Sequence, residues 1–383
     1  MSIAIIAVGY NRPDSMKRLL NSIIKADYSD DVVDLIVSID KGERQKEVIN
    51  VAEEIEWGHG EKIIRAFTER QGLRPHILQC GDLTERYDAV VVLEDDITVS
   101  KGFYTYVKQV IQRYGEDTDV SGISLYKHRI NPGNKRPFDP AESPYDIYFM
   151  QMAQSWGECW NRRMWKEFRR WYTDHGDMIL LDEKIPEYIV RWNDASWLKY
   201  YNRYVVETGT YFVYPYASLT TNHSEIGEHA STEGIEFQVP LMDYVMEYRL
   251  PAVLQGIRYD IFFERLGIEK DVLPELHGKK MLDLMGTRTQ FGDSDYLVST
   301  QLLNYKVVKE IRLMYRPMEE NCLSPTDGKG IFVYDLHHNA KVPQANKDIV
   351  TNYDLKGYSW RLILKYGVHS LKSALIRKVF HKP

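Results

Sequence analysis

Hydrophobic residues in the first 126 positions follow two alternating spacings. Short runs of apolar, mostly β-branched residues at 3–9, 32–39 and 89–93 predict buried β-strands. After each run, apolar residues recur at the i, i+3, i+4 spacing of one helix face. These residues are Met16, Leu19, Leu20, Ile23 and Ile24 in the first helix, Val48, Val51, Ala52 and Ile55 in the second, and Phe103, Val107, Val110, Ile111 and Tyr114 in the third. The alternation predicts a layered α/β domain.

The rest of the chain changes in composition. Residues 127–144 are rich in proline and predict a long loop, and residues 145–260 hold six of the eight tryptophans. Aromatic side chains most often fill cores, so we interpret this density first as packing and second as a platform for sugar rings. The segment 261–358 shows no recognisable chemistry, and its role stays open.

The last segment, 359–383, is basic. Leu364, Val368, Leu371 and Leu375 recur at helical spacing, and no acidic residue interrupts the segment. Such a helix suits the surface of an anionic membrane, where basic side chains meet lipid headgroups. A C-terminal helix docked on its own protein with a solvated basic face is an equal alternative.

Composition limits the class of protein. With 44% hydrophobic and 27% charged residues, the 383-residue chain has the proportions of a globular protein with a sizeable core. The formal net charge of −6 gives no reason to expect nucleic acid as a partner. The three cysteines lack the spacing of a disulfide framework or zinc site, and no apolar stretch is long enough to cross a bilayer. We expect a cytoplasmic protein, with at most peripheral contact at the inner face of the cell membrane.

The strongest chemical signal is Glu94-Asp95-Asp96, directly after the apolar run 89–93. Ligands of open α/β sheets bind at the carboxyl ends of the strands. Three adjacent carboxylates repel one another, and a divalent cation such as Mg²⁺ or Mn²⁺ removes that repulsion and bridges the phosphates of a nucleotide. An acidic turn that only caps the next helix is the alternative. The buried run before the turn and the amphipathic helix after it favour the metal site.

These motifs, in this order, resemble those of the GT-A glycosyltransferases, in particular the inverting N-acetylglucosaminyltransferase I type and related bacterial polysaccharide transferases. The matching stretches are 6–12, 37–40 and 91–96, each at the end of a predicted strand. The resemblance covers about residues 1–126, with a weaker continuation from Ser155 to His229. It implies an α/β fold in which a Rossmann-like mixed sheet is flanked by helices. We expect a C-terminal, mostly helical extension after that domain.

The resemblance also implies a position for each residue that binds the donor. These residues would be Val8, Tyr10, Arg12, Asp40, Glu94 and Asp95. The first three would surround the base and reach the phosphates, and Asp40 would accept a hydrogen bond from the base. Asp96 would be the direct metal ligand. Taken singly, a surface ion pair for Arg12 or a turn for Asp40 is an equally good interpretation, but their shared position at strand ends favours a site.

Three basic positions follow from the same resemblance. Arg74 or His76 would meet the diphosphate, although both also suit an ordinary helix start around Pro75. His229, at the end of the stretch 221–229, would join the metal, because neutral imidazole is a good ligand for Mn²⁺. The resemblance favours His229 over His223, and a solvated polar loop is the alternative.

Inverting sugar transfer needs a carboxylate that takes a proton from the attacking hydroxyl. Asp194, shortly before Trp197, resembles the acidic residue that precedes a tryptophan in the family. A helix N-cap is an equally good interpretation of Asp194, and both roles can hold together. Rival carboxylates are Asp182, Glu183, Glu187 and Glu228.

The sequence therefore predicts a metal-dependent glycosyltransferase. It would move a sugar from a nucleotide-diphosphate donor, by resemblance a UDP-sugar, to a saccharide or lipid-linked saccharide, with inversion, in surface polysaccharide synthesis. Residues 1–126 would bind the donor, and 127–260 would bind the acceptor and carry the catalytic base. A sugar nucleotidyltransferase is one alternative, although Gly9-Tyr10-Asn11-Arg12-Pro13 is poor in glycine for that class. A non-catalytic protein that binds a nucleotide-sugar or glycan and is recruited to the membrane is another.

Overall fold

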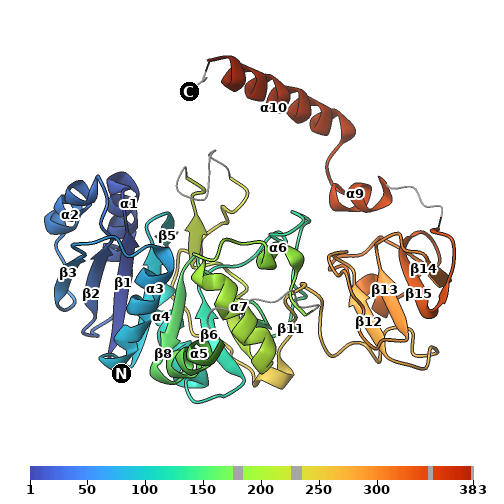
Figure 1. Ribbon diagram of the computed structural model, residues 1–383, viewed down its shortest axis with the longest axis horizontal. Helices are drawn as coiled ribbons and strands as arrows, with labels where there is room; N and C mark the ends of the chain where they lie inside the picture. The colour runs from blue at the N-terminus through green and yellow to red at the C-terminus, as the bar shows by residue number, and fades with distance from the viewer. Residues whose placement is uncertain (176–183, 226–234, 344–347, 381–383) are drawn as a thin grey trace.

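A nine-stranded mixed sheet forms the centre of the computed structural model, which describes residues 1–175, 184–225, 235–343 and 348–380 (Figure 1). The strand order is β11-β7-β9-β6-β8-β4-β1-β2-β3. One half of the sheet is parallel and consists of β1 (Ile3–Gly9), β2 (Asp34–Ile39), β3 (Lys62–Ala66) and β4 (Ala89–Glu94). The strands predicted at 3–9, 32–39 and 89–93 are confirmed as β1, β2 and β4.

The other half of the sheet makes it mixed. It consists of β6 (Val120–Ser124), β7 (Ile147–Met150), β8 (Glu158–Asn161), β9 (Tyr211–Pro215) and the short β11 (Arg258–Tyr259). β8 runs antiparallel to both β4 and β6 and so joins the two halves. This register places Glu158, the first residue of β8, opposite Val92 of β4, close to the carboxyl end where Glu94 lies.

Helices cover the sheet as the apolar spacing predicts. They are α1 (Pro13–Ile24), α2 (Gln45–Glu54), α3 (Leu73–Gly81), α4 (Phe103–Tyr114), α5 (Arg162–His175), the single turn α6 (Glu187–Val190) and α7 (Trp197–Thr208). α1 packs against α2, and α7 packs against α3 and α5. The predicted α/β class, with a mixed sheet flanked by helices, is confirmed. Trp160, Trp165 and Trp197 are buried together, so for these three the packing interpretation is also confirmed.

A small antiparallel pair lies beside the main sheet. β5 (Ile97–Val99) follows the Glu94-Asp95-Asp96 turn and pairs with β10 (Thr220–Asn222). The pairing matches Ile97 with Asn222, and the His223 backbone N–H donates to the Asp96 carbonyl. Residues more than 120 positions apart in the sequence therefore meet at the edge where the carboxylates lie.

The segment after residue 260 corrects one expectation. Instead of a mostly helical extension, it contains a four-stranded sheet of order β12-β13-β15-β14. The strands are β12 (Lys280–Asp283), β13 (Tyr296–Ser299), β14 (Tyr305–Arg312) and β15 (Gly330–Asn339), with short helices α8 (Glu320–Leu323) and α9 (Asp348–Asp354) beside them. Ile331 and Val333 pack on one face of β15, and Phe332 and Tyr334 pack on the other. Apolar residues on both faces hide the two-residue alternation that marks a strand.

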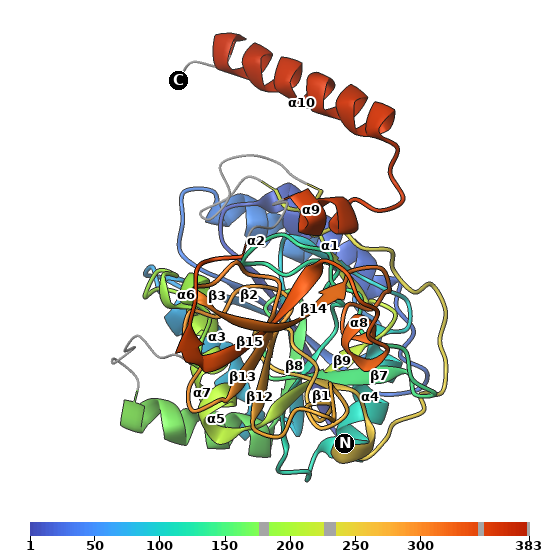
Figure 2. The ribbon, with the colours of Figure 1, turned by 90° about the vertical axis from the view of Figure 1, so that its right-hand side faces the viewer.

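The chain ends in α10 (Trp360–Phe380), which stands apart from both sheets (Figures 1 and 2). The helix predicted over 359–383 is thus present. No helix among the described residues is both long enough and apolar enough to cross a membrane.

Candidate functional site

A cavity of about 320 Å³ opens at the carboxyl ends of β1, β2 and β4. Eight of the residues predicted to bind donor or metal line it: Val8, Tyr10, Arg12, Asp40, His76, Glu94, Asp95 and Asp96. Gly9, Asn11, Arg70, Leu73 and Glu225 complete the lining. Residues from five separate stretches of sequence therefore share one cavity.

Parallel pairing explains why these residues meet. Gly9 pairs with Ile39, and Val8 pairs with Glu94, so all three strands end at one level. The Asp40 backbone N–H donates to the Gly9 carbonyl at 2.9 Å, which extends the pairing into the turn. A Cβ on Gly9 would lie 2.4 Å from the Met16 Cε, so a larger residue where β1 turns into α1 requires the Met16 side chain to shift.

Asp40 organises the floor of the cavity. Its Oδ1 accepts from the backbone N–H groups of Lys41 and Gln71, both at 2.8 Å, and its Oδ2 accepts from Gly72 N–H at 2.9 Å. The carboxylate thus fixes the turn before α3 as well as lining the cavity. Turn formation and a contact with a bound base are compatible, since Oδ2 has a second lone pair.

His76 lines the cavity as a neutral ring. Burial lowers its pKa to about 4, and the charge of Arg65 acts in the same direction. Its Nε2 lies 2.6 Å from the Ser38 Oγ, and Phe67 contacts the ring edge-on. At neutral pH His76 therefore offers hydrogen bonding and shape to a diphosphate, but no positive charge.

Arg12 is a cationic group set among the carboxylates. Its guanidinium contacts Asp95 directly and lies 3.7 Å from Asp96. Burial lowers the pKa of Arg12, but the charges of Asp95 and Asp96 outweigh burial and raise it overall. Arg12 therefore remains charged while it holds Asp95.

Negative charge at this edge exceeds what Arg12 can balance. Burial, and then the charges of Asp96 and Asp95, raise the pKa of Glu94 to about 8. Burial also raises the pKa of Asp95 to about 7. Glu158, fully buried beside them, has its pKa raised by burial and by the charge of Glu94.

Several carboxylate oxygens in this group lack a partner. Asp96 Oδ1 and both Glu158 oxygens are buried and accept no hydrogen bond within the described chain. Buried polar atoms are normally paired, so unpaired ones need a physical reason, such as a ligand or ion.

Among the described residues no group of three or more His, Cys, Asp or Glu side chains is arranged to hold a metal by itself. A Mg²⁺ or Mn²⁺ ion needs fewer ligands from the protein, because one or two carboxylates, together with substrate phosphates and waters, complete its coordination shell. Asp96 fits that role.

Two of the lining residues that were not predicted, Arg70 and Glu225, carry charged side chains. The Arg70 guanidinium lies 4.2 Å from the centre of the Tyr10 ring and forms one wall of the cavity. Glu225 is held by Ser15 at 2.6 Å and by Arg18 at 2.5 and 2.7 Å. Glu225 lies more than 200 positions from α1, and no local pattern points to that contact.

Arg74 and Asp194 lie away from the cavity lining. Arg74 packs over the Tyr200 ring at 4.8 Å. The Asp194 side chain is 81% exposed and accepts from the Lys199 Nζ at 2.7 Å. That hydrogen bond and the charge of Lys199, with a smaller contribution from Arg74, lower the pKa of Asp194. Ser196 is the N-cap residue of α7, and no side chain caps that helix, so Asp194 is not its cap.

Of the two histidines in the 221–229 stretch, the structure describes only His223. His229, predicted on the metal, lies outside the described residues, as do the rival carboxylates Asp182, Glu183 and Glu228. His223 is described, and its Nε2 lies 2.7 Å from the Thr98 Oγ1 of β5. Burial, and then the charge of Arg18, lower the pKa of His223.

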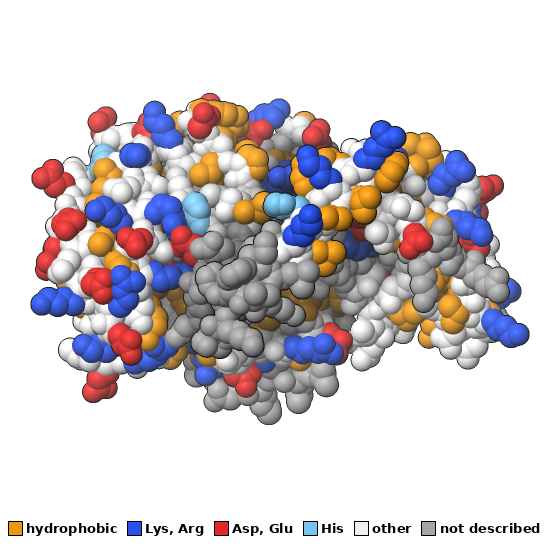
Figure 3. Space-filling view, turned by 90° about the horizontal axis from the view of Figure 1, so that it is seen from above, with side chains coloured by type: hydrophobic (Ala, Val, Ile, Leu, Met, Phe, Trp, Pro, Cys, Tyr) orange, Lys and Arg blue, Asp and Glu red, His pale blue; other side chains and the backbone are white. Residues whose placement is uncertain are grey.

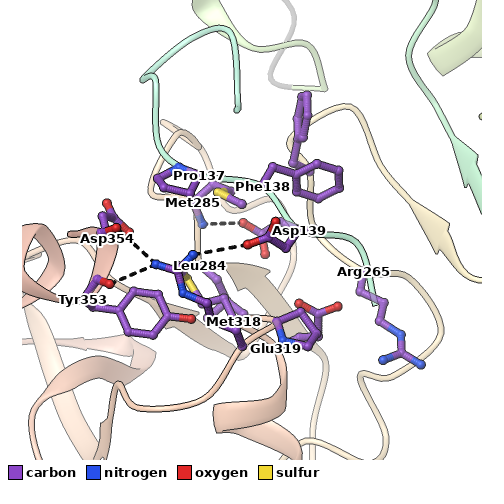
Figure 4. Close-up of a pocket in the computed structure, with 14 residues that line it drawn as sticks. Pro137, Phe138, Asp139, Arg265, Leu284, Met285, Met318, Glu319, Tyr353 and Asp354 are labelled. Carbon is purple, nitrogen blue, oxygen red and sulfur yellow. Dashed lines mark hydrogen bonds and ion pairs between the residues drawn. The ribbon is translucent and has the colours of Figure 1, made fainter. Parts of the chain in front are cut away.

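A second cavity lies where the loop 127–144 meets the C-terminal sheet, but it holds only about 20 Å³ (Figure 4). That volume admits about one water molecule. Arg316 crosses it from Asp139, at 3.2 Å, to the backbone carbonyls of Tyr353 and Asp354. We interpret it as a joint between two parts of the chain, and not as a ligand site.

Comparisons with known proteins give a loose structural likeness. No protein-family model and no curated protein matches the sequence. The structure is similar to that of S. aureus TarS 1–349 in complex with UDP-GlcNAc, with 11% identity and a TM-score of 0.39 over 60% of each chain. It is also similar to the mannosyltransferase PcManGT from Pyrobaculum calidifontis in complex with GDP-Man and Mn²⁺, with 16% identity and a TM-score of 0.31. That match covers 44% of this chain and 46% of the other, so this chain spans less than two thirds of either protein.

Proposed function

We propose that this chain is a metal-dependent glycosyltransferase. It transfers a sugar, with inversion, from a nucleotide-diphosphate donor, first of all a UDP-sugar, to a saccharide or lipid-linked saccharide acceptor in surface polysaccharide synthesis. The observation that carries the proposal is the 320 Å³ cavity, in which eight predicted residues meet, four of them carboxylic acids. Ionised carboxylates accommodate a diphosphate only when a cation accompanies it.

The donor would bind across the strand ends. The base would lie near Asp40 and Tyr10, where Arg70 already covers the Tyr10 ring. The ribose would lie near Glu94 and Asp95, and Arg12 would approach the phosphates from the start of α1. Bound Mg²⁺ or Mn²⁺, held by Asp96, would supply charge neutralisation for the departing diphosphate.

The catalytic base of the proposal is Asp194. Its lowered pKa keeps it ionised, as a proton acceptor must be, and its exposure leaves it open to an incoming hydroxyl. It lies three residues before Trp197, whose side chain lies close enough to Glu94 of the donor cavity to lower the pKa of that carboxyl. The segment 194–197 therefore connects the exposed carboxylate with the donor cavity.

Calorimetry with UDP tests the donor site. We expect UDP binding with Mn²⁺ to weaken about 100-fold or more, both with a chelator and in Asp96→Ala, because a bridging metal contributes several kcal/mol. Glu61→Ala is the matched control, since Glu61 is an exposed carboxylate just before β3, at the opposite edge of the sheet. UDP binding that is equally tight without metal, or absent throughout, would reject the metal-bound donor site.

Turnover tests the base. We expect Asp194→Ala to keep its affinity for UDP and Mn²⁺ while the release of UDP from a UDP-sugar falls by about 10²–10⁴-fold, the usual contribution of a general base. Glu187→Ala is the matched control among the rival carboxylates. If the release of UDP falls only in Glu187→Ala, the catalytic base is Glu187 and not Asp194. Donor binding without turnover in the unsubstituted protein favours the non-catalytic alternative.

A further inference from the structure

α10 (Trp360–Phe380) exposes an unusual amount of apolar side chain. It stands apart from the rest of the described chain and is joined to it through α9 (Figures 1 and 2). The exposed fractions are 69% for Trp360, 58% for Leu364 and 66% for Leu371. Contiguous exposed apolar surface of this kind marks a binding surface.

Five of the exposed apolar residues share one side of the helix, whereas Leu362 and Tyr366 lie on the opposite side. Trp360, Ile363, Leu364, Val368 and Leu371 follow the spacing i, i+3, i+4, i+8, i+11. The basic residues Arg361, Lys365 and Lys372 follow i, i+4, i+11, which places them in a stripe along one edge of that side. The sequence holds no acidic residue after Asp354, so this surface has one sign of charge.

An anionic lipid surface fits this pattern better than a protein does. Basic side chains along one edge of an apolar face meet lipid headgroups while the apolar side chains enter the acyl boundary. Trp360 also suits that depth, because its ring is apolar with a polar atom. A second copy of α10 would instead bring two basic stripes together with no carboxylate between them.

The donor cavity opens on the side of the molecule where α10 lies. β1, β2 and β4 run from the edge near the N-terminus toward this side, so their carboxyl ends, where the cavity lies, point to it (Figures 1 and 2). Figure 3 looks down on this side and shows hydrophobic, Lys and Arg side chains next to one another on it. A flat surface bound by α10 on its side away from the two sheets would therefore face the cavity mouth.

We infer that α10 lies in the headgroup layer of an anionic phospholipid membrane and turns the mouth of the donor cavity toward that membrane. Membrane binding stands independently of any activity. The functional consequence of the orientation rests on the proposed function. If the chain transfers a sugar, this orientation implies that the acceptor is a saccharide presented at the bilayer surface.

Vesicle co-sedimentation of the full chain tests the binding. We expect it to bind vesicles of mixed phosphatidylcholine and phosphatidylglycerol, and to bind phosphatidylcholine alone weakly. Each basic residue near such a surface contributes about fivefold, so Lys365→Gln/Lys372→Gln lowers the partition coefficient about 25-fold. The matched control is Lys166→Gln/Arg170→Gln on α5, which lies at the opposite edge of the molecule (Figure 1) and binds as the unsubstituted chain does. Equal loss in both variants, or no binding to either vesicle, overturns the inference.

A second copy of the chain is the rival occupant of the α10 face. Sedimentation equilibrium of the full chain distinguishes it. We expect a mass that does not change between the unsubstituted chain and Leu364→Ser/Leu371→Ser, whereas vesicle binding falls in the variant. A dimer that dissociates in this variant overturns the inference in favour of self-association.

Fluorescence quenching tests the orientation. Cys80, Cys159 and Cys322 are all buried, so a dye reacts with an introduced cysteine. Glu43→Cys lies just beyond β2, at the carboxyl edge, and Lys166→Cys lies on α5. We expect quenching by spin-labelled headgroups at position 43 and little at 166, and the reverse overturns the orientation. If the chain binds vesicles but does not bind UDP, the proposed function is rejected while the membrane inference stands.

Discussion

Two groups of buried and half-buried carboxylates lie in this molecule, and they differ in how many hydrogen bonds and ion pairs their oxygens accept. One group lines or adjoins the donor cavity and consists of Glu94, Asp95, Asp96 and Glu158. The other lies between the main sheet and the C-terminal sheet and consists of Asp260, Glu264 and Asp283. We call them the donor cluster and the joint cluster.

The joint cluster is paired by backbone and side-chain donors. Asp260 accepts from the N–H groups of Phe262 and Glu264 at 2.8 and 2.9 Å and forms an ion pair with Arg288. Asp283 accepts from Ser299 at 2.8 Å and from several neighbouring donors. None of its carboxylate oxygens is among the buried atoms that lack a partner in the described chain.

The donor cluster is incomplete by comparison. Among the described residues, the ion pairs of this cluster are those of Arg12 with Asp95 and Asp96, whereas Asp96 and Glu158 keep buried oxygens without a partner there. Completed pairing holds a fold together, and incomplete pairing costs stability unless something else binds. The difference supports the proposal that the donor cluster holds an occupant, whereas the joint cluster stabilises the fold.

The largest stability effect is expected in the joint cluster. Arg288→Met leaves Asp260 buried without its cation, which costs about 3–5 kcal/mol in the free energy of unfolding. Urea unfolding followed by tryptophan fluorescence measures it. Arg249→Met removes an exposed partner of Asp146, and we expect no measurable shift in its urea midpoint. Equal effects in the two variants would remove the distinction between buried and exposed pairs.

A pH dependence comes next. Burial, and then the charges of Asp283 and Asp260, raise the pKa of Glu264 to about 8 from an ordinary 4.5. Between these values the folded chain holds a proton that the unfolded chain has lost, so stability falls as the pH rises, by about 1.4 kcal/mol per pH unit. In Glu264→Gln, the slope of the unfolding free energy against pH should become less negative by about 1.4 kcal/mol per pH unit. A slope that stays unchanged would mean that Glu264 is ionised in the fold.

A smaller effect of opposite sign is expected in the donor cluster. Glu158→Met removes two buried oxygens that lack partners and keeps a side chain of similar length, so the free energy of unfolding should rise by about 1 kcal/mol. Glu319→Met is the matched control, because Glu319 is equally buried but accepts from the Tyr259 hydroxyl at 2.8 Å. We expect this control to be destabilised. Destabilisation of both would show that Glu158 is paired after all.

Much of the fold and of the site's position follows from local patterns. β1, β2 and β4 are continuous apolar runs, and the residues after them must share an edge because parallel strands end together. This is why Arg12, Asp40 and Asp96 could be placed in one site before any contact was known. Strand β3 was missed because it lies at the sheet edge and carries Lys62 and Arg65.

Other contacts depend on the tertiary structure and leave no local trace. Glu225 meets Arg18 across more than 200 positions, and Arg70 covers Tyr10 from a different turn. Arg74 was expected to meet the diphosphate, yet it faces Tyr200, because α3 turns this residue toward α7. Residue type and spacing cannot distinguish the faces of a helix that has neighbours on more than one side.

The smallest stability effect should come from Asp194, outside both clusters. Asp194→Asn keeps the shape of an exposed side chain that does not cap α7, and the Asn Oδ1 can still accept from the buried Lys199 Nζ, so we expect the urea midpoint to fall only slightly. The Lys199 Nζ also still donates to the Trp192 carbonyl at 2.9 Å. An exposed carboxylate whose removal costs the fold little and costs UDP release about 10²–10⁴-fold acts in the reaction. A strongly lowered midpoint with normal UDP release would instead make Asp194 a residue that orders the start of α7.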